Sequence, residues 1–269
     1  METTHRPRFL MASDFDQTLS FHDSGAVLAE LLNVRNFEHK VEGLAASNLV
    51  QQGGELAYLI RHDPEFRGVR REHLEEAGRR VRLKAGIREL ASCLAELPEA
   101  EFSFYVVSAA PRQIVESALC GIVPPANIFG TEFDLDPGSG EVRAIKRVPA
   151  GYGKVAVLDE LALATRTPLE RIVYVGDGSS DVHVMLHVNN GDGFTVAVSE
   201  NSQLARIAHS VVLSDSAFSV LAPVLSRMLN WRLGRIRSLF ERYGFNLDAW
   251  EQERTDRIEV SELEYRHVS

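Results

Sequence analysis

The sequence is poor in cysteine and has no long apolar run, and both absences argue against classes of protein. The 269-residue chain has two cysteines, Cys93 and Cys120, whose spacing fits no metal motif. We interpret both as reduced residues of helical core segments in a reducing compartment. No apolar run approaches the roughly 20 residues that span a bilayer, and the N-terminal METTHRPRFL has no apolar signal-peptide centre. We therefore expect a cytoplasmic protein.

The sequence also lacks an excess of positive charge. It has 29 basic and 38 acidic residues and a net charge of -9, so it carries no electrostatic footprint for nucleic acid or an anionic membrane. Hydrophobic residues make up 45% and charged residues 25% of the chain, as in ordinary globular proteins. The length allows one large domain or a core with a smaller partner. We expect neither nucleic acid nor a membrane as a partner.

Apolar runs alternate with helical patterns along most of the chain. Strands are expected at residues 8–14, 102–110, 171–177, 194–199 and 210–215, and a hairpin at 131–145. Helices are expected at 86–97, 112–119, 154–166, from about 180, and at 201–208, while the last forty or so residues are charged and fit a helix better than a strand. This alternation predicts an α/β fold with a Rossmann-like parallel sheet covered by helices on both faces.

Polar side chains stand where three of these strands end. Asp14 and Asp16 follow the first strand, Ser108 ends the second, and Asp177 follows the strand at 171–177. In such sheets ligands bind at the carboxyl ends of the strands, so these side chains are predicted to meet in one crevice. Two carboxylates this close repel each other unless a cation or a shared proton separates them. Taken singly, Asp14 and Asp16 would more simply be turn or helix-cap residues, and Ser108 an ordinary strand-end residue.

Four stretches of the chain together resemble the motifs of the haloacid-dehalogenase-like phosphatases. DFDQT (14–18) looks like the first motif, Ser108 in VVSAA the second, Lys154 in GYGK the third and GDGSSD (176–181) the fourth. They occur in the family's order. The insertion after the first motif resembles the small helical cap of the phosphoserine-phosphatase-like branch, and KAGIREL (84–90) resembles its return to the core.

The resemblance implies a Mg²⁺-dependent phosphatase and a role for each motif residue. Asp14 would attack phosphorus and become an aspartyl phosphate, and Asp16 would serve as acid and then base. Mg²⁺ would be held by side-chain oxygens of Asp14 and Asp177 and by the backbone carbonyl of Asp16, with its waters oriented by Asp181. Lys154 would balance charge. The phosphoryl oxygens would be held by Thr18, Ser108, Lys154 and backbone N–H groups such as that of Ala109.

The resemblance also divides the chain into a core and a cap. Residues 1–20 and 85–232 are expected to form the catalytic core, residues 21–84 a helical cap inserted after the first strand, and residues 233–269 a charged helical extension through which an oligomer could form. Asp23 and Arg61 occupy cap positions similar to those that contact the substrate amine and carboxylate in phosphoserine phosphatases. The substrate is expected to be a small-molecule phosphate ester, either phosphoserine or a related phosphometabolite.

Several alternatives stay open at this point. The same aspartyl phosphate would serve a phosphotransferase or mutase, and a non-catalytic interaction protein could keep the fold. His183 and His187 are spaced as a helical zinc pair, although ordinary helix residues are favoured because no third ligand is evident. Gly53 and Gly54 form either a cap hinge or a plain loop.

Overall fold

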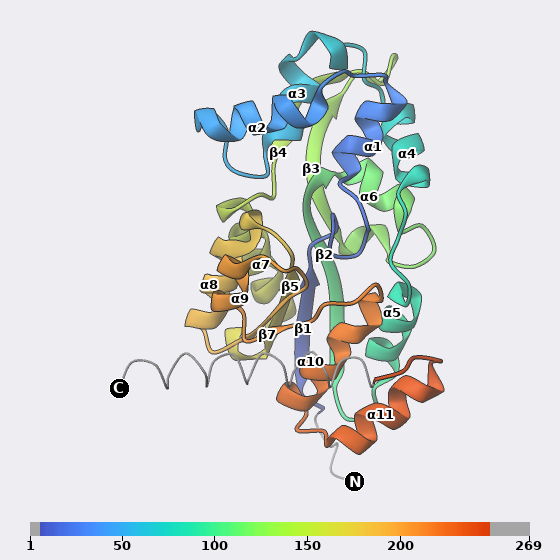
Figure 1. Ribbon diagram of the computed structural model, residues 1–269, viewed down its shortest axis with the longest axis vertical. Helices are drawn as coiled ribbons and strands as arrows, with labels where there is room; N and C mark the ends of the chain where they lie inside the picture. The colour runs from blue at the N-terminus through green and yellow to red at the C-terminus, as the bar shows by residue number, and fades with distance from the viewer. Residues whose placement is uncertain (1–5, 248–269) are drawn as a thin grey trace.

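The computed structural model describes residues 6–247 and contains a seven-stranded sheet in the order β4-β3-β2-β1-β5-β6-β7 (Figure 1). All neighbouring strands are parallel except β3 and β4, which form the antiparallel hairpin that the sequence predicts. The α/β fold is confirmed. The strands are β1 (Arg8–Ser13), β2 (Glu101–Pro111), β3 (Ile128–Leu135), β4 (Val142–Arg147), β5 (Ile172–Gly176), β6 (Phe194–Ala197) and β7 (Ser210–Val211).

Helices cover both faces of the sheet, as the alternating pattern predicts. Along β1, Leu10 and Ala12 belong to one buried cluster and Met11 to the other, because successive side chains of a strand point to opposite faces. The Leu10 face packs against α7 (Tyr152–Thr165), α8 (Val182–Asn190) and α9 (Ser202–Ile207). The Met11 face packs against α5 (Ile87–Glu96), α6 (Arg112–Ala118), α10 (Leu221–Met228) and α11 (Leu233–Arg242).

The central strand β1 brings the predicted site residues to one edge of the sheet. It lies between β2 and β5, with Ser13 paired to Val106 and to Val175. The backbone N–H of Asp14 then donates to the carbonyl of Val175 at 2.9 Å, so the chain leaves the strand beside the end of β5. The pairing of β2 with β3 shifts register between Val107 and Pro111. Such irregularities re-aim side chains near binding sites, and this one contains Ser108.

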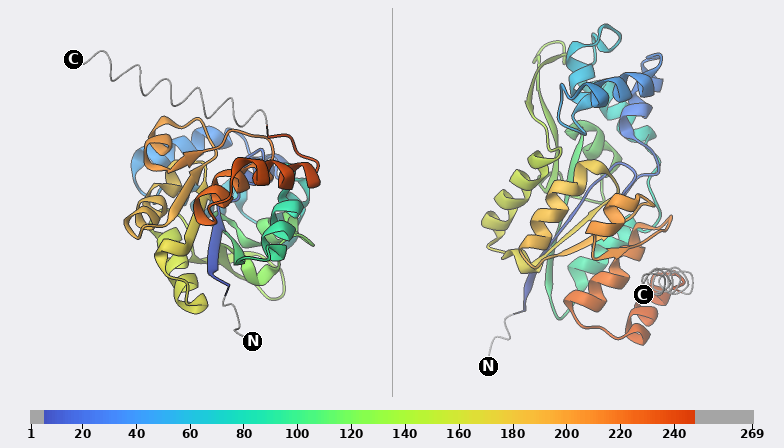
Figure 2. Two further views of the ribbon diagram at one scale, coloured as in Figure 1. Left: turned by 90° about the horizontal axis from the view of Figure 1, so that it is seen from below. Right: turned by 60° about the vertical axis from the view of Figure 1, so that its left-hand side comes forward.

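The segment predicted as a cap is helical and contributes no strand to the sheet among the described residues. It contains α1 (Ser24–Leu31), α2 (Phe37–Ser47), α3 (Glu55–His62), a short 3₁₀ turn (Pro64–Phe66) and α4 (Arg71–Arg80). In Figure 1 and the right-hand view of Figure 2, these helices lie at the end of the molecule opposite α10 and α11. The division into core and cap stays a prediction.

Contacts with the β3–β4 hairpin and with α6 fasten this helical segment to the rest of the chain. The N–H of Arg71 donates to the carbonyl of Gly140 in the β3–β4 hairpin at 3.1 Å. Helix α4 packs closely on α6, because a Cβ added at Gly78 would lie 2.3 Å from the carbonyl oxygen of Ile114. The segment is therefore anchored on the α6 side, while α2 and α3 lie over the strand ends.

The apolar sides of the C-terminal helices are buried against the rest of the protein. Phe240 of α11 contacts Phe218 with ring centroids 4.9 Å apart, and Ile236 and Leu239 are also buried. Residues 233–247 therefore pack on the same face as α5 rather than standing apart from it. The remainder of the predicted extension, 248–269, lies outside the described residues. None of the helices in residues 6–247 is both long enough and apolar enough to cross a membrane.

Three local predictions need correction. Cys120 is exposed and follows the end of α6, so it is not a core residue, whereas Cys93 in α5 is buried. The helix expected from Ser180 begins with a 3₁₀ turn at Ser179–Asp181, and α8 follows it. The strand expected at 210–215 shortens to Ser210–Val211, because only these residues pair with β6.

Candidate active site

Asp14 is held in place from two directions at the end of β1. Its Oδ1 accepts the backbone N–H of Phe15 at 2.6 Å, and its Oδ2 lies 2.7 Å from Nζ of Lys154. Both charged side chains are almost completely buried. Burial would lower the pKa of Lys154, but the carboxylates of Asp14 and Asp181 outweigh it and raise that pKa. Lys154 is therefore a fixed positive charge against Asp14.

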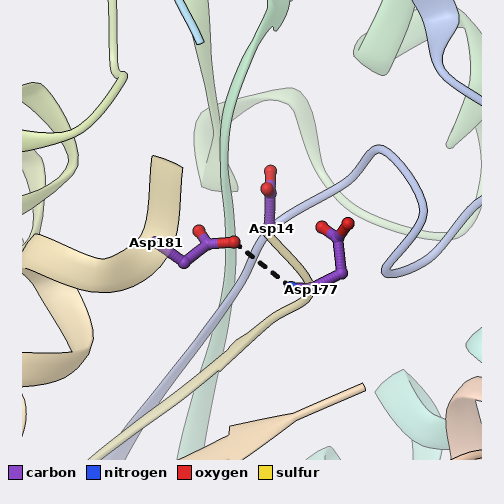
Figure 3. A group of neighbouring side chains, drawn as sticks. All are labelled: Asp14, Asp177 and Asp181. Atoms are coloured by element: carbon purple, nitrogen blue, oxygen red, sulfur yellow. Dashed lines mark hydrogen bonds between the residues drawn. The ribbon is translucent and has the colours of Figure 1, made fainter. Parts of the chain in front are cut away.

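Asp181 fixes the loop that carries Asp177. Its Oδ1 accepts bonds from Lys154 Nζ and from the Tyr174 hydroxyl, each at 2.6 Å. Its Oδ2 accepts the backbone N–H groups of Asp177 and Gly178 at 3.2 and 3.1 Å. Figure 3 shows Asp181 reaching from the helical segment before α8 toward Asp14 and Asp177. Because each oxygen of Asp181 already accepts two donors, we regard it as a positioning residue.

Gly176 makes this arrangement possible. A Cβ at that position would lie 2.5 Å from the Asp181 carboxylate, closer than two such atoms approach. Glycine is thus required at position 176 because the Asp181 side chain approaches the backbone closely there, and not because of a positive φ.

The carboxylates form a site suited to a hard divalent cation. Oxygen atoms of Asp14, Asp177 and Asp181 lie within 4.8 Å of one another, and no other such group of metal-binding side chains exists in residues 6–247. Burial, with repulsion from Asp181, raises the pKa of Asp14 to about 6. Burial and repulsion from Asp14 and Asp181 raise the pKa of Asp177 to about 7. Since a bound cation would relieve this repulsion, and all the donors are oxygens, the residues fit Mg²⁺.

Asp16 lies beside Asp14 but in a different environment. Its carboxylate accepts the backbone N–H and the hydroxyl of Ser24 at 2.9 and 3.0 Å. Burial, with repulsion from Asp23 and Asp14, raises its pKa well above the usual range. The two aspartates thus differ as a nucleophile and a proton donor should: one is paired with lysine, and the other favours its protonated form.

A cavity of about 290 Å³ connects these residues with the helices above them. Asp14, Asp16 and Asp177 line it together with Ser108 and Ala109 from the end of β2. The hydroxyl oxygen of Ser108 accepts the N–H of Ala110 at 3.1 Å, and Ser108 is buried. The cavity also receives Asp23, whose Oδ1 caps α1 by accepting the N–H groups of Gly25 and Ala26. The structure therefore brings most of the predicted site residues to one space.

Four predicted residues do not line this cavity: Lys154 and Asp181, which lie beneath it with the contacts described above, and Thr18 and Arg61. Thr18 is buried, and its hydroxyl donates to Oδ1 of Asp177 at 3.1 Å, so it supports a carboxylate instead of facing the cavity. Arg61 lies in the last turn of α3, where its side chain is exposed. Neither is part of the cavity lining, and the geometry gives no support to Arg61 as a substrate contact.

The two histidines make separate contacts instead of sharing a ligand. The His183 ring stacks on Tyr152 with centroids 4.1 Å apart, and Nε2 of His187 lies 2.7 Å from Oδ1 of Asp159. Among the described residues, neither belongs to a group of three or more potential metal ligands. The interpretation as ordinary helix residues, between α7 and α8, is the one the contacts favour.

The loop before α3 reaches the strand ends, and the sequence analysis left its role open. Gly53 has a φ of +91°, and a Cβ there would lie 3.0 Å from Cβ of Ser180 and 3.6 Å from Cβ of Ala109. A Cβ at Gly151 would lie 2.2 Å from Nε2 of Gln51 in the same loop. The loop is thus seated on the core, next to the aspartates.

Several cavity residues were not predicted from the sequence. Phe37, Val41 and Ala45 lie at intervals of four on α2, and Leu56 and Glu55 come from α3. The four-residue spacing marks an apolar helix face and could have been noticed. Nothing in the spacing, however, indicates that this face covers a cavity.

Comparisons with known proteins agree with this geometry. The profile described as haloacid dehalogenase-like hydrolase matches residues 11–186, more than half of the chain. Among curated proteins no significant match was found. A solved substrate-bound phosphoserine phosphatase is 18% identical with a TM-score of 0.65, over 81% of this chain and 98% of its own.

Two further solved structures are similar to the chain. A phospho-aspartyl intermediate analogue of phosphoserine phosphatase is 20% identical with a TM-score of 0.61, over 80% of this chain and 98% of its own. A phosphoserine phosphohydrolase-like protein from Francisella tularensis is 16% identical with a TM-score of 0.61, over 79% and 99%. At these identities the structural matches establish the fold alone.

Proposed function

The chain belongs to the haloacid dehalogenase-like hydrolase family, and from this premise we propose that it is a Mg²⁺-dependent phosphatase. It hydrolyses the phosphate monoester of a small molecule through an aspartyl phosphate on Asp14. The observation that carries the proposal is the pairing of two unlike aspartates in one cavity. Asp14 is ion-paired with the buried Lys154, and Asp16 is held by Ser24 with a raised pKa.

The different protonation states of Asp14 and Asp16 give the two aspartates different roles in the reaction. Asp14 has a pKa of about 6, so it is ionised near neutral pH and can attack phosphorus. A bound cation would favour its anionic form further. Asp16 keeps its proton to higher pH and can give it to the leaving alcohol oxygen as the ester P–O bond breaks. Asp16 then takes a proton from water as that water attacks phosphorus, which releases inorganic phosphate and restores Asp14.

The cation would be held by the side chains of Asp14 and Asp177 and the backbone carbonyl of Asp16. When bound, Mg²⁺ supplies neutralising charge to the phosphoryl group and its nucleophile. Thr18 and Asp181 keep Asp177 in place through the contacts described above. Lys154 compensates the charge of the Asp14 carboxylate before transfer and that of the phosphoryl group after it.

The phosphoryl oxygens are assigned to the end of β2. Ser108 and Ala109 line the cavity from the end of β2, and the central strand β1 separates β2 from β5, which precedes Asp177. The carbonyl of Ala109 is turned away from this space, because it accepts the Thr131 hydroxyl at 2.6 Å. This orientation removes an acceptor that would repel phosphate, and it supports a phosphoryl site at these residues.

The cavity and the loop above it favour small substrates. A volume of about 290 Å³ is at the lower end for ligand pockets, which leaves room for a phosphoryl group and a short alcohol. The Gly53 loop lies beside Ser180 and Ala109, which line the cavity with the aspartates, so the loop narrows access to them. Phosphoproteins are expected to be poor substrates for the same reason.

The proposal is tested by measuring phosphate release from a panel of small phosphate esters, with Mg²⁺ and after exhaustive chelation. We expect turnover that requires Mg²⁺ and returns when Mg²⁺ is restored. Asp14→Asn, which keeps the shape but not the nucleophile, should abolish turnover and leave the circular dichroism unchanged. Full activity after chelation would contradict the metal assignment. Transfer to an added alcohol without phosphate release would instead identify a phosphotransferase.

A further inference from the structure

Glu55 is a buried carboxylate in the cavity that the proposed chemistry does not use. It is the first residue of α3 and is 6% exposed. Its Oε2 accepts the backbone N–H of Gly53 at 2.8 Å, whereas its Oε1 is buried without a hydrogen-bond partner among the described residues. A buried carboxylate oxygen without a donor is destabilising, so this atom is suited to a donor that arrives with a ligand.

The charges around Glu55 indicate which ligand that is. Asp23 lines the same cavity as Glu55, and burial together with repulsion from Asp23 raises the pKa of Glu55. Among the described residues that line the cavity, there is no lysine, arginine or histidine. Lys40, on the neighbouring α2, is ion-paired with Asp63 and Glu65. The part of the lining that Asp23 and Glu55 contribute is therefore acidic, and it attracts a cation and repels a carboxylate.

The lining also includes four apolar side chains from α2 and α3. Phe37, Val41 and Ala45 on α2, with Leu56 on α3, face the same space. The wall is tightly built, because a Cβ at Gly25 would lie 2.8 Å from Cζ of Phe37 and 3.0 Å from Cδ2 of Leu56. These side chains accept a short hydrocarbon chain.

We infer that the substrate is the phosphate monoester of an amino alcohol: a short hydrocarbon with an ammonium group at its far end and no carboxylate. The ammonium group donates to Oε1 of Glu55, with Asp23 as the second negative charge near it. The carbon chain lies against Phe37, Val41 and Leu56. This inference deepens the proposed phosphatase function and rests on it.

The test compares three esters of matched length on the full-length protein with Mg²⁺: aminopropyl phosphate, butyl phosphate and carboxypropyl phosphate. The wild-type kcat/KM should be highest for the amino ester and lowest for the carboxylate ester. Glu55→Gln keeps the acceptor for Gly53 but removes the charge. It should lower kcat/KM for the amino ester by about 10- to 100-fold, the range of a charge-assisted hydrogen bond.

The matched control is Glu72→Gln, which makes the same charge change at an exposed residue of α4 outside the cavity. It should leave kcat/KM for all three esters unchanged, whereas Glu55→Gln should lower kcat/KM much more for the amino ester than for butyl phosphate. An equal loss on all three esters would assign Glu55 to holding the Gly53 loop and overturn the inference. The inference would also be overturned if the wild-type enzyme did not prefer the amino ester, and this measurement needs no variant. Failure to hydrolyse any ester, p-nitrophenyl phosphate included, would reject the phosphatase function itself and the inference with it.

Discussion

Replacing Asp177 with asparagine is expected to stabilise the metal-free protein above about pH 7 and to abolish its stabilisation by Mg²⁺. Asp177 has a folded-state pKa of about 7, against 3.8 for the ordinary carboxyl. A raised pKa means that the native state holds the proton more tightly than the unfolded chain. The native state therefore loses stability as the pH rises from about 4 to about 7, and above that the loss is complete.

The size of the effect follows from the shift. About three pKa units, at 1.36 kcal/mol each, correspond to about 4 kcal/mol as an upper bound. Asparagine keeps the oxygen that accepts the Thr18 hydroxyl but cannot ionise, so the variant does not lose this free energy. For a protein of this size 1 kcal/mol moves Tm by roughly 2–4 °C, so a difference of roughly 10 °C is the scale expected at about pH 8.

Calorimetric Tm values at about pH 5 and about pH 8, in EDTA and in Mg²⁺, measure this. Without metal, the Tm of the variant should equal that of the wild type at the lower pH and exceed it at the higher pH. Mg²⁺ should raise the Tm of the wild type alone, because Asp177 is a proposed ligand. Asp192→Asn, at an exposed position whose φ of +59° asparagine tolerates, is the matched control and should change neither. Equal Tm values for wild type and Asp177→Asn at the higher pH would refute the reasoning.

Two further changes test the buried ion pair and the loop. Lys154→Met leaves Asp14 and Asp181 buried without their cation, so the protein should lose activity and about 3–5 kcal/mol of unfolding free energy by denaturant titration. The loss should be smaller below about pH 5, where Asp14 takes up a proton. Gly53→Ala should lower kcat/KM roughly tenfold, because its positive φ and the nearby core both resist a Cβ; Gly68→Ala, with a φ of +87° and no atom within 4 Å, is the control and should leave kcat/KM intact.

The fold and the strand-end residues could be predicted because their signals are local. A continuous apolar run such as residues 9–12 predicts a buried strand, and the alternation of strands with helices predicts a parallel sheet. Such a sheet brings the ends of β1, β2 and β5 together, so Asp14, Ser108 and Asp177 could be expected in one place before any geometry was known.

The helical segment was harder to predict because its contacts depend on helix register. Arg61 and Glu55 lie six residues apart on α3, yet one is exposed and the other is buried in the cavity. Sequence spacing fixes which residues share a helix face, but it does not fix which face covers the site. Tyr174 was missed for a related reason: it occurs within an apolar strand, and nothing local indicates that its hydroxyl meets Asp181.

The central claim is a covalent phosphoryl group on Asp14, and mass spectrometry after a rapid acid quench tests it most directly. During turnover of a good ester, the peptide that contains Asp14 should carry one phosphoryl group. Asp16→Asn should raise the phosphorylated fraction of Asp14 when an ester with a good leaving group is used. Such an ester forms the intermediate without help from an acid, but the variant lacks the base that activates water to hydrolyse it. Asp14→Asn should show no phosphoryl group. Steady turnover by the wild type, together with an Asp16→Asn variant that never carries a phosphoryl group on Asp14, would contradict the account.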